Sequence, residues 1–231
     1  MIKFQEVSKT FFTRAGHKQI IALKSVSFEI KPAEFVTIVG KSGAGKTTLL
    51  KLILAEERPT RGDIFFNGDN LGKIKTAKLP RIRRKIGTVF QDYKLLPLKT
   101  AYENIAYILK AVGAEESEIL RNVPEVLGIV GLASRAQNFP EELSAGERQR
   151  IAIARALIHR PKVILADEPT GNLDPYCALD IIKLLLKINE IGTTVILSTH
   201  DKEIINRLGK RVLTLEQGAL IRDEERGHFI L

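Results

Sequence analysis

The stretch FVTIVGKSGAGKTT, residues 35–48, decides the fold. Its opening, Phe35–Val39, shows no alternation of apolar and charged side chains, which predicts a strand buried on both faces. A segment rich in glycine follows at once, and residues 46–54 have the pattern of a helix. The stretch therefore predicts a buried strand, a tight loop and a helix in immediate succession.

The glycine-rich loop has the spacing of a phosphate-binding loop, because residues 40–47 match G-x-x-x-x-G-K-[ST]. Glycines let the backbone approach phosphate oxygens, and the N-terminus of the following helix adds partial positive charge. Lys46 suits the β- and γ-phosphates of a nucleotide, and the Thr47 hydroxyl suits Mg²⁺. The expected nucleotide contacts are Ser42, Gly43, Ala44, Gly45, Lys46, Thr47 and Thr48.

A second apolar strand ends in two adjacent acids. Residues 163–166 are apolar, and Asp167 and Glu168 follow directly. Many strands end in a charged residue for purely structural reasons, so the pair alone is weak evidence. In a chain with a phosphate-binding loop it predicts nucleotide hydrolysis: Asp167 would bind the metal, directly or through water, and Glu168 would orient and polarise the attacking water.

Short apolar runs alternate with longer helical stretches along the chain, which predicts an α/β fold with a largely parallel sheet. The strand that ends in the acid pair is expected at 162–166, and another buried strand at 193–198, with a helix at 175–189 between them. The first third predicts a small antiparallel layer, and the chain ends in a predicted hairpin. The layer comprises 2–7, 26–30 and 63–66, the hairpin strands are 211–215 and 219–222, and two further helices are expected at 102–112 and 117–127.

We interpret residues 1–231 as a single domain with a helical insertion. Residues 92–150 carry no strong strand pattern. The predicted division is therefore a core of about 1–91 and 151–231, with a helical subdomain at about 92–150.

Composition narrows the functional class. With 44% hydrophobic residues the chain is not a disordered one, and no apolar run approaches the ~18–20 residues of a membrane span. The N-terminus turns polar at once and does not resemble a secretory signal. A single cysteine, Cys177, excludes a disulfide framework and indicates a reducing, cytoplasmic setting. The net charge of +9 favours an anionic partner, whether nucleotide, phospholipid or nucleic acid.

Several ordered motifs resemble those of the ATP-binding cassette (ABC) ATPases. LSAGE at 143–147 resembles the family signature, and DEPTGNLD at 167–174 resembles the acidic strand end and the D-loop. VFQD at 89–92 resembles the Q-loop, and STHD at 198–201 resembles the switch histidine. The likeness covers nearly the whole chain. It implies an ATPase with a P-loop NTPase (RecA-like) core, a mostly parallel sheet, an N-terminal antiparallel β layer and a helical subdomain.

The resemblance also implies roles for single residues. Glu168, His200 and Gln91 would be catalytic, Gln91 would join Thr47 and Asp167 at the Mg²⁺, and Phe11 would stack on adenine. Cassettes of this family pair head to tail around two ATP molecules, so a second copy would contribute contacts in trans. The residues expected to do so are Ser144, Gly146, Glu147 and Asp174.

Structural alternatives stand beside several of these roles. Ser144 followed by Glu147 is a capping box, and Asp174 before Pro175 is a helix N-cap. For Phe11 the less favoured alternative is a core aromatic. Ala145 stands where the signature usually has its first glycine; its methyl group would crowd the γ-phosphate, or be harmless where the local φ is negative.

Within the family, YKLLP at 93–97 and TAYENIA at 100–106 resemble the bacterial cell-division ATPases. This implies ATP-driven homodimerisation and an FtsX-like integral membrane subunit, which would hold the cassette at the cytoplasmic face of the cell membrane. The alternative is the ATPase of a lipoprotein-release or macrolide-type exporter. A nucleic-acid partner is not expected, since such cassettes usually need a second cassette or a long coiled coil. A phosphotransferase is disfavoured by the signature and the D-loop.

Residues 73–85 contain seven lysines and arginines and no acid. They supply most of the excess charge and lead into the Q-loop. One interpretation is a solvated basic face. The other is a surface near anionic lipid headgroups, where each basic residue adds about 1 kcal/mol.

Overall fold

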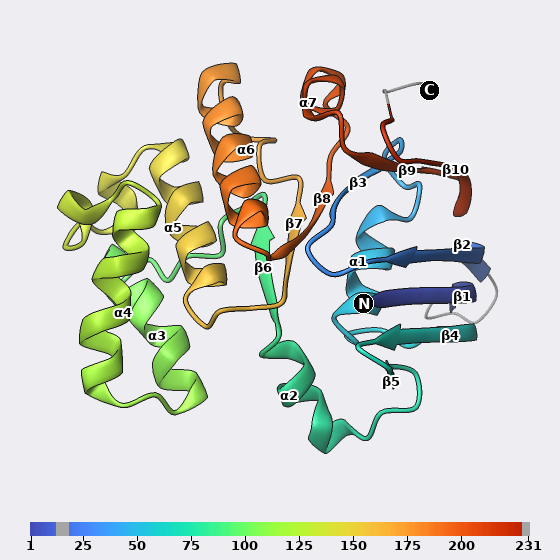
Figure 1. The fold of residues 1–231 in the computed structure, drawn as a ribbon, viewed down its shortest axis with the longest axis horizontal. Helices are drawn as coiled ribbons and strands as arrows, with labels where there is room; N and C mark the ends of the chain where they lie inside the picture. The colour runs from blue at the N-terminus through green and yellow to red at the C-terminus, as the bar shows by residue number, and fades with distance from the viewer. Residues whose placement is uncertain (13–18, 228–231) are drawn as a thin grey trace. The chain divides into compact units, whose positions relative to one another are not determined.

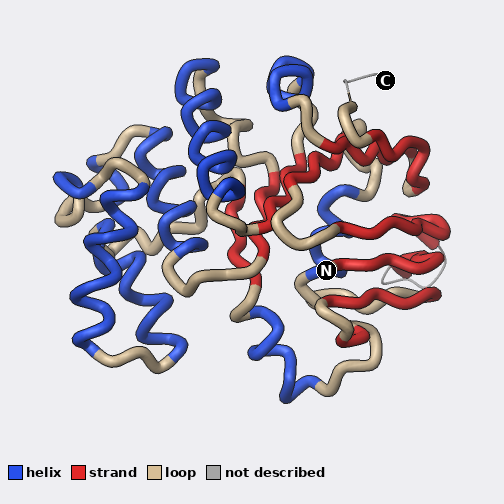
Figure 2. The backbone as a smooth tube through the Cα atoms, in the orientation of Figure 1, coloured by secondary structure: helices blue, strands red, loops and turns tan. Residues whose placement is uncertain are grey.

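The computed structural model describes residues 1–12 and 19–227. The chain forms two compact units, Met1–Arg83 with Thr194–Leu231, and Arg84–Thr193. Figure 2 distinguishes their helices from their strands.

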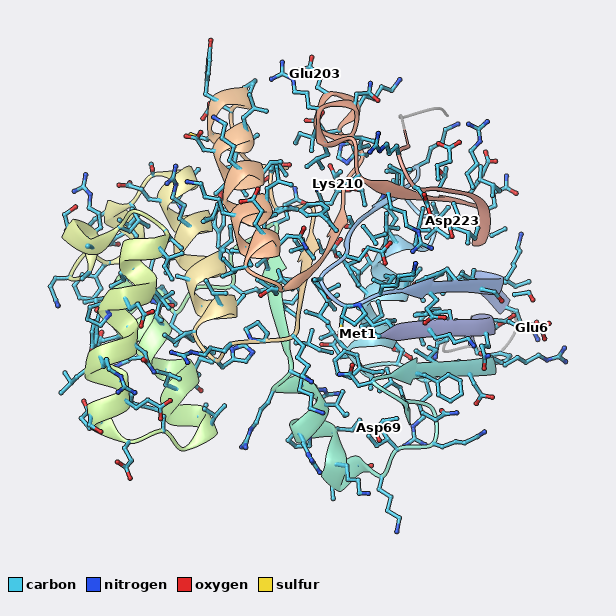
Figure 3. All side chains as sticks on the ribbon, viewed as in Figure 1. Met1, Glu6, Asp69, Glu203, Lys210 and Asp223 are labelled. Atoms are coloured by element: carbon cyan, nitrogen blue, oxygen red, sulfur yellow. The ribbon has the colours of Figure 1, made fainter. Side chains whose placement is uncertain are left out.

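The first unit contains a four-stranded antiparallel sheet in the order β2-β1-β4-β5, in which β2, β1 and β4 run side by side (Figure 1). This is the antiparallel layer that the sequence predicts. Figure 3 places Met1 immediately before β1, Glu6 along it and Asp69 on β5. The strands are β1 (Ile2–Phe12), β2 (Gln19–Ile30), β4 (Arg61–Phe66) and β5 (Asp69–Asn70).

Strands β1 and β2 are longer than their apolar patterns predict. The register of their pairing shifts three times, between Phe4 and Val7, Val7 and Lys9, and Lys9 and Thr10. At the first shift Glu6 has φ 49°, and Gln5 and Glu6 are both exposed. Such bulges break the alternation of inward and outward side chains, so the sequence pattern ends before the strand does.

The second sheet of this unit has the order β10-β9-β3-β8. Strand β3 pairs in parallel with β8 and β9, and β9 forms the predicted hairpin with β10. Every residue of β3 and β8 is buried, as the absence of alternating charged side chains in both strands predicts. The bounds are β3 (Phe35–Val39), β8 (Thr194–Ser198), β9 (Arg211–Glu216) and β10 (Ala219–Glu224).

Three α-helices belong to the described part of the first unit. Helix α1 (Lys46–Ile53) begins at the residue that the loop pattern indicates. Helices α2 (Leu79–Arg83) and α7 (Lys202–Leu208) are too short for an amphipathic period to reveal them. The start of α7 is fixed by Asp201, whose carboxylate accepts the backbone N–H groups of Glu203 at 2.9 Å and Ile204 at 3.2 Å.

The second unit pairs two parallel strands with four α-helices. Helix α3 packs against α4 and α5, and α5 also contacts β6 and α6. Figure 1 shows α3 and α4 lying beside each other. The predicted helices at 102–112, 117–127 and 175–189 are confirmed, with ends shifted by one or two residues. The elements are β6 (Ile86–Phe90), β7 (Val163–Asp167), α3 (Ala101–Val112), α4 (Glu116–Ile129), α5 (Ala145–Leu157) and α6 (Pro175–Glu190).

Asn104, fully buried on α3, holds the loop that precedes this helix. Its Oδ1 accepts the N–H of Leu96 at 2.8 Å. Its Nδ2 donates to the carbonyls of Leu96 at 3.1 Å, Lys99 at 2.9 Å and Thr100 at 3.0 Å. One amide side chain thus fixes the backbone between the Q-loop and α3.

Replacing Asn104 by Ala should lower the free energy of unfolding by about 1–3 kcal/mol, because buried backbone groups lose their partners. Thermal or urea unfolding measures this. Lys110→Ala, exposed on the same helix, is the control and should change stability by less than about 0.5 kcal/mol. Equal stability of the two variants would contradict the role of the amide.

The basic run at 73–85 is mostly exposed. Arg83 is engaged, because its guanidinium donates to the carbonyls of Leu54 and Ala55, both at 3.1 Å. Lys73 pairs with Asp63 at 3.2 Å. A role near lipid headgroups stays a prediction. Across residues 1–12 and 19–227, no helix combines the length and apolar composition that a membrane crossing needs.

Candidate active site

The phosphate-binding loop, residues 40–45, joins β3 to α1 in the first unit. Lys46 is 9% exposed, and its Nζ donates to the carbonyls of Gly40 at 2.7 Å and Lys41 at 3.4 Å. Ser42 and Gly43 are exposed, and a Cβ added at Gly43 would meet nothing within 4 Å. The ammonium therefore lies against the loop backbone, while the middle of the loop is open for a ligand.

The hairpin turn between β9 and β10 anchors this loop. The N–H of Gly218 donates to the carbonyl of Ala44 at 3.1 Å, and the N–H of Lys24 donates to the carbonyl of Gly218 at 2.7 Å. Gly218 has φ +82°, and an added Cβ would lie 2.8 Å from the carbonyl oxygen of Ala22. Gly218 thus links the loop to β2. The sequence predicts the hairpin but gives no signal for this long-range contact.

Gly218→Ala should lower stability by about 1–3 kcal/mol, because the position needs a left-handed backbone and leaves no room for a methyl group. It should also weaken nucleotide binding, because the loop loses its anchor. Thermal unfolding and ATP titration test both effects.

Gly68→Ala is the matched control. Gly68 also has positive φ in a hairpin turn, but its added Cβ would meet nothing within 4 Å. It should show the backbone strain alone, with ATP affinity unchanged. Identical ATP affinities of the two variants would argue against the anchoring contact.

Two other predicted site residues belong to the first unit. Phe11 is half-buried on β1, with the ammonium of Lys9 4.8 Å from its ring centroid. His200 is exposed and lies two residues after the end of β8. The N–H of Thr199, the residue before it, donates to the carbonyl of Ile38 at 3.2 Å, and Asp201 after it caps α7. The backbone is therefore held on both sides of the histidine.

The acid pair lies at the end of β7 in the second unit. Asp167 is the last residue of the strand, and Glu168 has φ 47°, a left-handed conformation that is costly for a residue other than glycine. The N–H of Gly171 donates to the carbonyl of Glu168 at 3.1 Å and closes the turn. Backbone strain of this kind is common at active sites and is kept where the surrounding structure enforces it.

Gln91 follows β6 and contacts the same turn. Its Nε2 donates to Oδ1 of Asn172 at 3.1 Å, and Nδ2 of Asn172 donates to the backbone carbonyl of Gln91 at 3.1 Å. The structure thus brings Gln91 to the turn that begins at Glu168. No local sequence signal gives Asn172 a role of its own, because an asparagine in a turn is ordinarily explained by turn propensity.

Helix α5 holds the backbone on either side of Gln91. Gln149 Nε2 lies 3.5 Å from the carbonyl of Phe90. Arg155 donates to the carbonyl of Tyr93 at 2.8 Å and to that of Lys94. Tyr93 and Lys94 both have positive φ. The arginine therefore stabilises a strained segment of the Q-loop.

Ser144 and Glu147 form the predicted capping box at the start of α5. Ser144 Oγ accepts the N–H of Glu147 at 3.3 Å and donates to the Glu147 carboxylate at 2.8 Å. The same carboxylate accepts the backbone N–H of Ser144 at 2.8 Å. The backbone N–H and hydroxyl of Ser144, aided by Arg135, hold the pKa of Glu147 below its usual value. The box fixes the N-terminus of α5.

The two small residues of the signature have different surroundings. Ala145 is the first residue of α5. Its φ is not positive, so its methyl group causes no backbone strain. Gly146 is buried against α6, where an added Cβ would lie 3.2 Å from Cys177 Sγ. Asp174 is the N-cap of α6, as predicted: its Oδ1 accepts the N–H groups of Tyr176 and Cys177, both at 3.0 Å. Hydrogen bonds from Cys177 lower the pKa of the Asp174 carboxyl.

The predicted magnesium ligands fit this ion by their chemistry. Thr47 offers a hydroxyl oxygen, Asp167 a carboxylate and Gln91 an amide oxygen, and Mg²⁺ prefers oxygen ligands. Within residues 1–12 and 19–227, no group of three or more histidine, cysteine, aspartate or glutamate residues could hold a metal ion alone.

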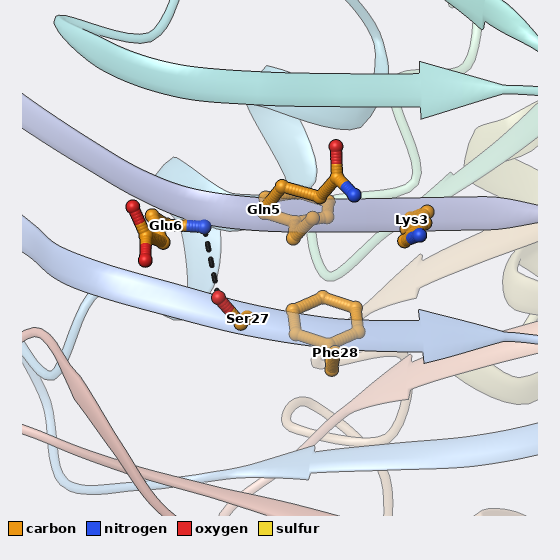
Figure 4. A pocket seen from close by; sticks show the side chains of 6 residues that line it. Lys3, Gln5, Glu6, Ser27 and Phe28 are labelled. Carbon is orange, nitrogen blue, oxygen red and sulfur yellow. Dashed lines mark hydrogen bonds between the residues drawn. The ribbon is translucent and has the colours of Figure 1, made fainter.

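A hollow of about 500 Å³ opens on the antiparallel sheet, and none of the predicted site residues lines it. Figure 4 shows its lining from β1 and β2, with the N–H of Glu6 donating to Ser27 Oγ at 2.8 Å. Its lining residues are Lys3, Phe4, Gln5, Glu6, Ser27 and Phe28. Loop, acid pair and signature all lie elsewhere in the chain, so we do not place the reaction here.

Comparisons with known proteins agree with the motifs. Residues 23–171 match the family model described as ABC transporter. The chain is 48% identical to the cell division ATP-binding protein FtsE of Bacillus subtilis, over 99% of this chain and 98% of the relative. It is 46% identical to FtsE of Escherichia coli, over 95% of this chain and 97% of the relative.

A solved structure shares the fold as well. It is a dimeric post-hydrolysis state of the ATP-binding cassette MJ0796 bound to ADP and Pi, with a TM-score of 0.87 and 40% identity over 99% of this chain and 100% of that one. The α/β P-loop NTPase fold predicted from the sequence is therefore confirmed. Together with the match over residues 23–171, these findings show that the chain belongs to the ABC transporter family, as one of its ATP-binding cassette ATPases.

Proposed function

We propose that this chain is the ATP-hydrolysing subunit of a membrane complex that acts in bacterial cell division. The observation that carries the proposal is that the chain is 46–48% identical, over nearly its whole length, to proteins named FtsE. The complex would contain an FtsX-like integral membrane subunit and would hold the cassette at the cytoplasmic face of the cell membrane. ATP-driven closure of two cassettes would then move the membrane partner.

The chain's own residues account for ATP binding. The open middle of the loop presents backbone N–H groups and the positive end of α1 to the phosphates. Lys46, already placed against the loop by the carbonyls of Gly40 and Lys41, would exchange these contacts for charge-assisted hydrogen bonds to the β- and γ-phosphates. Phe11 offers a flat apolar ring for the adenine base.

Hydrolysis would depend on the residues after β7 and β6. Glu168 would act as the general base that takes a proton from the attacking water. Gln91 and His200 would orient that water and stabilise the charge that develops on the γ-phosphate. When bound, Mg²⁺ would neutralise phosphate charge, with Thr47, Asp167 and Gln91 as its protein oxygens.

A second copy of the chain would complete the site. The capping box at Ser144 fixes the N-terminus of α5, a helix of 13 residues whose positive end suits the γ-phosphate of the partner's ATP. Gly146 and Glu147 would lie beside that phosphate, and Asp174 would lie at the dimer interface. The dimeric state of the ADP- and Pi-bound relative supports this arrangement.

Depletion of the chain in its native host, with rescue from a plasmid, tests the proposal. Loss of the chain should produce a division defect that the wild type rescues and Glu168→Gln does not. Detergent extracts should contain an integral membrane protein bound to the tagged chain in equal amounts. Normal division together with impaired export of a lipoprotein or a drug would contradict the proposal and favour an exporter.

A further inference from the structure

We propose that Asn172 is a positioning residue for ATP hydrolysis, which fixes the side-chain amide of Gln91 and links it to the turn that carries Glu168. This inference rests on the proposed function, because it assigns Asn172 a part in the same reaction. Asn172 itself is not expected to touch ATP.

The geometry is a closed pair of hydrogen bonds between the two residues. Gln91 Nε2 donates to Asn172 Oδ1, and Asn172 Nδ2 donates to the main-chain carbonyl of Gln91, each at 3.1 Å. The second bond sets which end of the asparagine amide is the acceptor. The first bond then sets which end of the glutamine amide is the donor. Neither amide can rotate by half a turn without losing its contact.

This orientation has a chemical consequence at Gln91. Because Nε2 is engaged by Asn172, the carbonyl oxygen Oε1 is the amide atom left to accept a hydrogen bond from water or to approach a cation. An amide oxygen suits both tasks, whereas the –NH₂ group would repel a cation. Asn172 therefore selects the productive orientation of Gln91.

The packing around the pair supports the same role. A Cβ added at Gly171 would lie 2.8 Å from Gln91 Nε2 and 3.0 Å from its Cδ, so the glycine leaves room for the amide in this position. The N–H of Gly171 also donates to the carbonyl of Glu168. A continuous path of contacts thus runs from Gln91 through Asn172 and Gly171 to Glu168.

The Q-loop backbone on both sides of Gln91 is also held from α5, by contacts that do not involve Asn172. The neighbouring carbonyls of Phe90 and Tyr93 accept hydrogen bonds from Gln149 and Arg155 on α5. Removal of the Asn172 side chain should therefore release the Gln91 amide while the Q-loop keeps its path. This separates a positioning role from a general structural one.

The first test measures steady-state ATP hydrolysis by the full chain. Asn172→Ala should lower kcat about 10-fold, the effect expected for losing two hydrogen bonds, with KM for ATP within about twofold of wild type. Asn172→Asp keeps an acceptor for Gln91 Nε2 and should give an intermediate kcat. Gln137→Ala, which removes an exposed amide of the same unit, is the control and should match wild type.

The decisive comparison repeats Asn172→Ala in a Gln91→Ala background. If Asn172 acts through the Gln91 side chain, it should cost less than about twofold there, since coupled residues are not additive. Gly171→Ala should behave likewise, because its methyl group displaces the amide only while Gln91 is present. A full, additive loss in either double variant would overturn the inference.

Two measurements distinguish failure of this inference from failure of the proposed function. Thermal unfolding and ATP affinity should be near wild type for Asn172→Ala; a large fall in both, with kcat falling in proportion to folded protein, would mean that Asn172 is only structural. Failure of the proposed function looks different. In that case the wild type would not hydrolyse ATP, or Glu168→Gln would hydrolyse it at the wild-type rate.

Discussion

Replacing Glu168 by Gln is expected to lower the ATP turnover number at least about 100-fold, the range that a general base contributes, while ATP binding persists. The substitution keeps the size and shape of the side chain and removes its ability to accept a proton. Glu168 has φ 47°, and its carbonyl closes the turn with the N–H of Gly171. These are backbone features that glutamine can retain, so the fold should be unaffected.

Phosphate release and ATP titration of the same preparation test this prediction. Glu190→Gln, which changes an exposed residue at the end of α6, is the matched control and should keep wild-type turnover. Both measurements are needed, because a variant that no longer binds ATP would lose turnover for a reason other than the missing general base. Wild-type turnover in Glu168→Gln would refute the assignment of Glu168.

Replacing Lys46 by Ala is expected to weaken ATP binding about 10- to 150-fold, since a hydrogen bond to a charged group contributes about 1.5–3 kcal/mol. Lys46 is nearly buried and held against the loop backbone at Gly40 and Lys41. Its ammonium is therefore already placed where phosphates would bind, and little conformational freedom would be lost on binding. Turnover should fall with the occupancy of the site.

Equilibrium binding of ATP measures the effect. Lys51→Ala removes an exposed ammonium from the same helix and should leave the ATP affinity within about twofold. A solvent-exposed charge outside the phosphate loop contributes little to ATP binding, because water screens it. Thermal unfolding of both variants shows whether the loop has kept its structure. Unchanged affinity in Lys46→Ala would contradict the phosphate-binding loop.

The elements nearest the phosphate loop could be predicted from the sequence. Strand β3 has the predicted bounds, and α1 begins at Lys46 as predicted. Both follow from local causes: an apolar run that must be buried, a glycine loop and a helix start. Asp174 and Ser144 were predicted as helix caps for the same local reason, and both accept the expected backbone N–H groups.

The features that the sequence could not predict depend on distant contacts. Gly218 supports the phosphate loop from far along the chain. Asn172 is 81 residues away from Gln91 in the sequence, yet the two side chains form a hydrogen bond. The bulges of β1 and the short helix α7 also escape a periodicity argument, since one breaks the period and the other is shorter than two turns.

The predicted contacts with the ATP of a second copy follow from family resemblance and not from local sequence patterns. The residues alone explain Ser144 as a cap, and only the resemblance to cassette ATPases gives it a nucleotide to face. Family membership is now shown by the match over residues 23–171. The contacts of Ser144, Gly146, Glu147 and Asp174 with a partner's ATP stay predictions.

The central claim is that nucleotide held by the phosphate loop is hydrolysed with Glu168 as the base. The most direct measurement is the identity of the nucleotide that remains on Glu168→Gln after incubation with ATP and Mg²⁺, removal of free ligand and denaturation. The account predicts intact ATP on this variant and mainly ADP on the wild type. ADP formed on Glu168→Gln at the wild-type rate would contradict it.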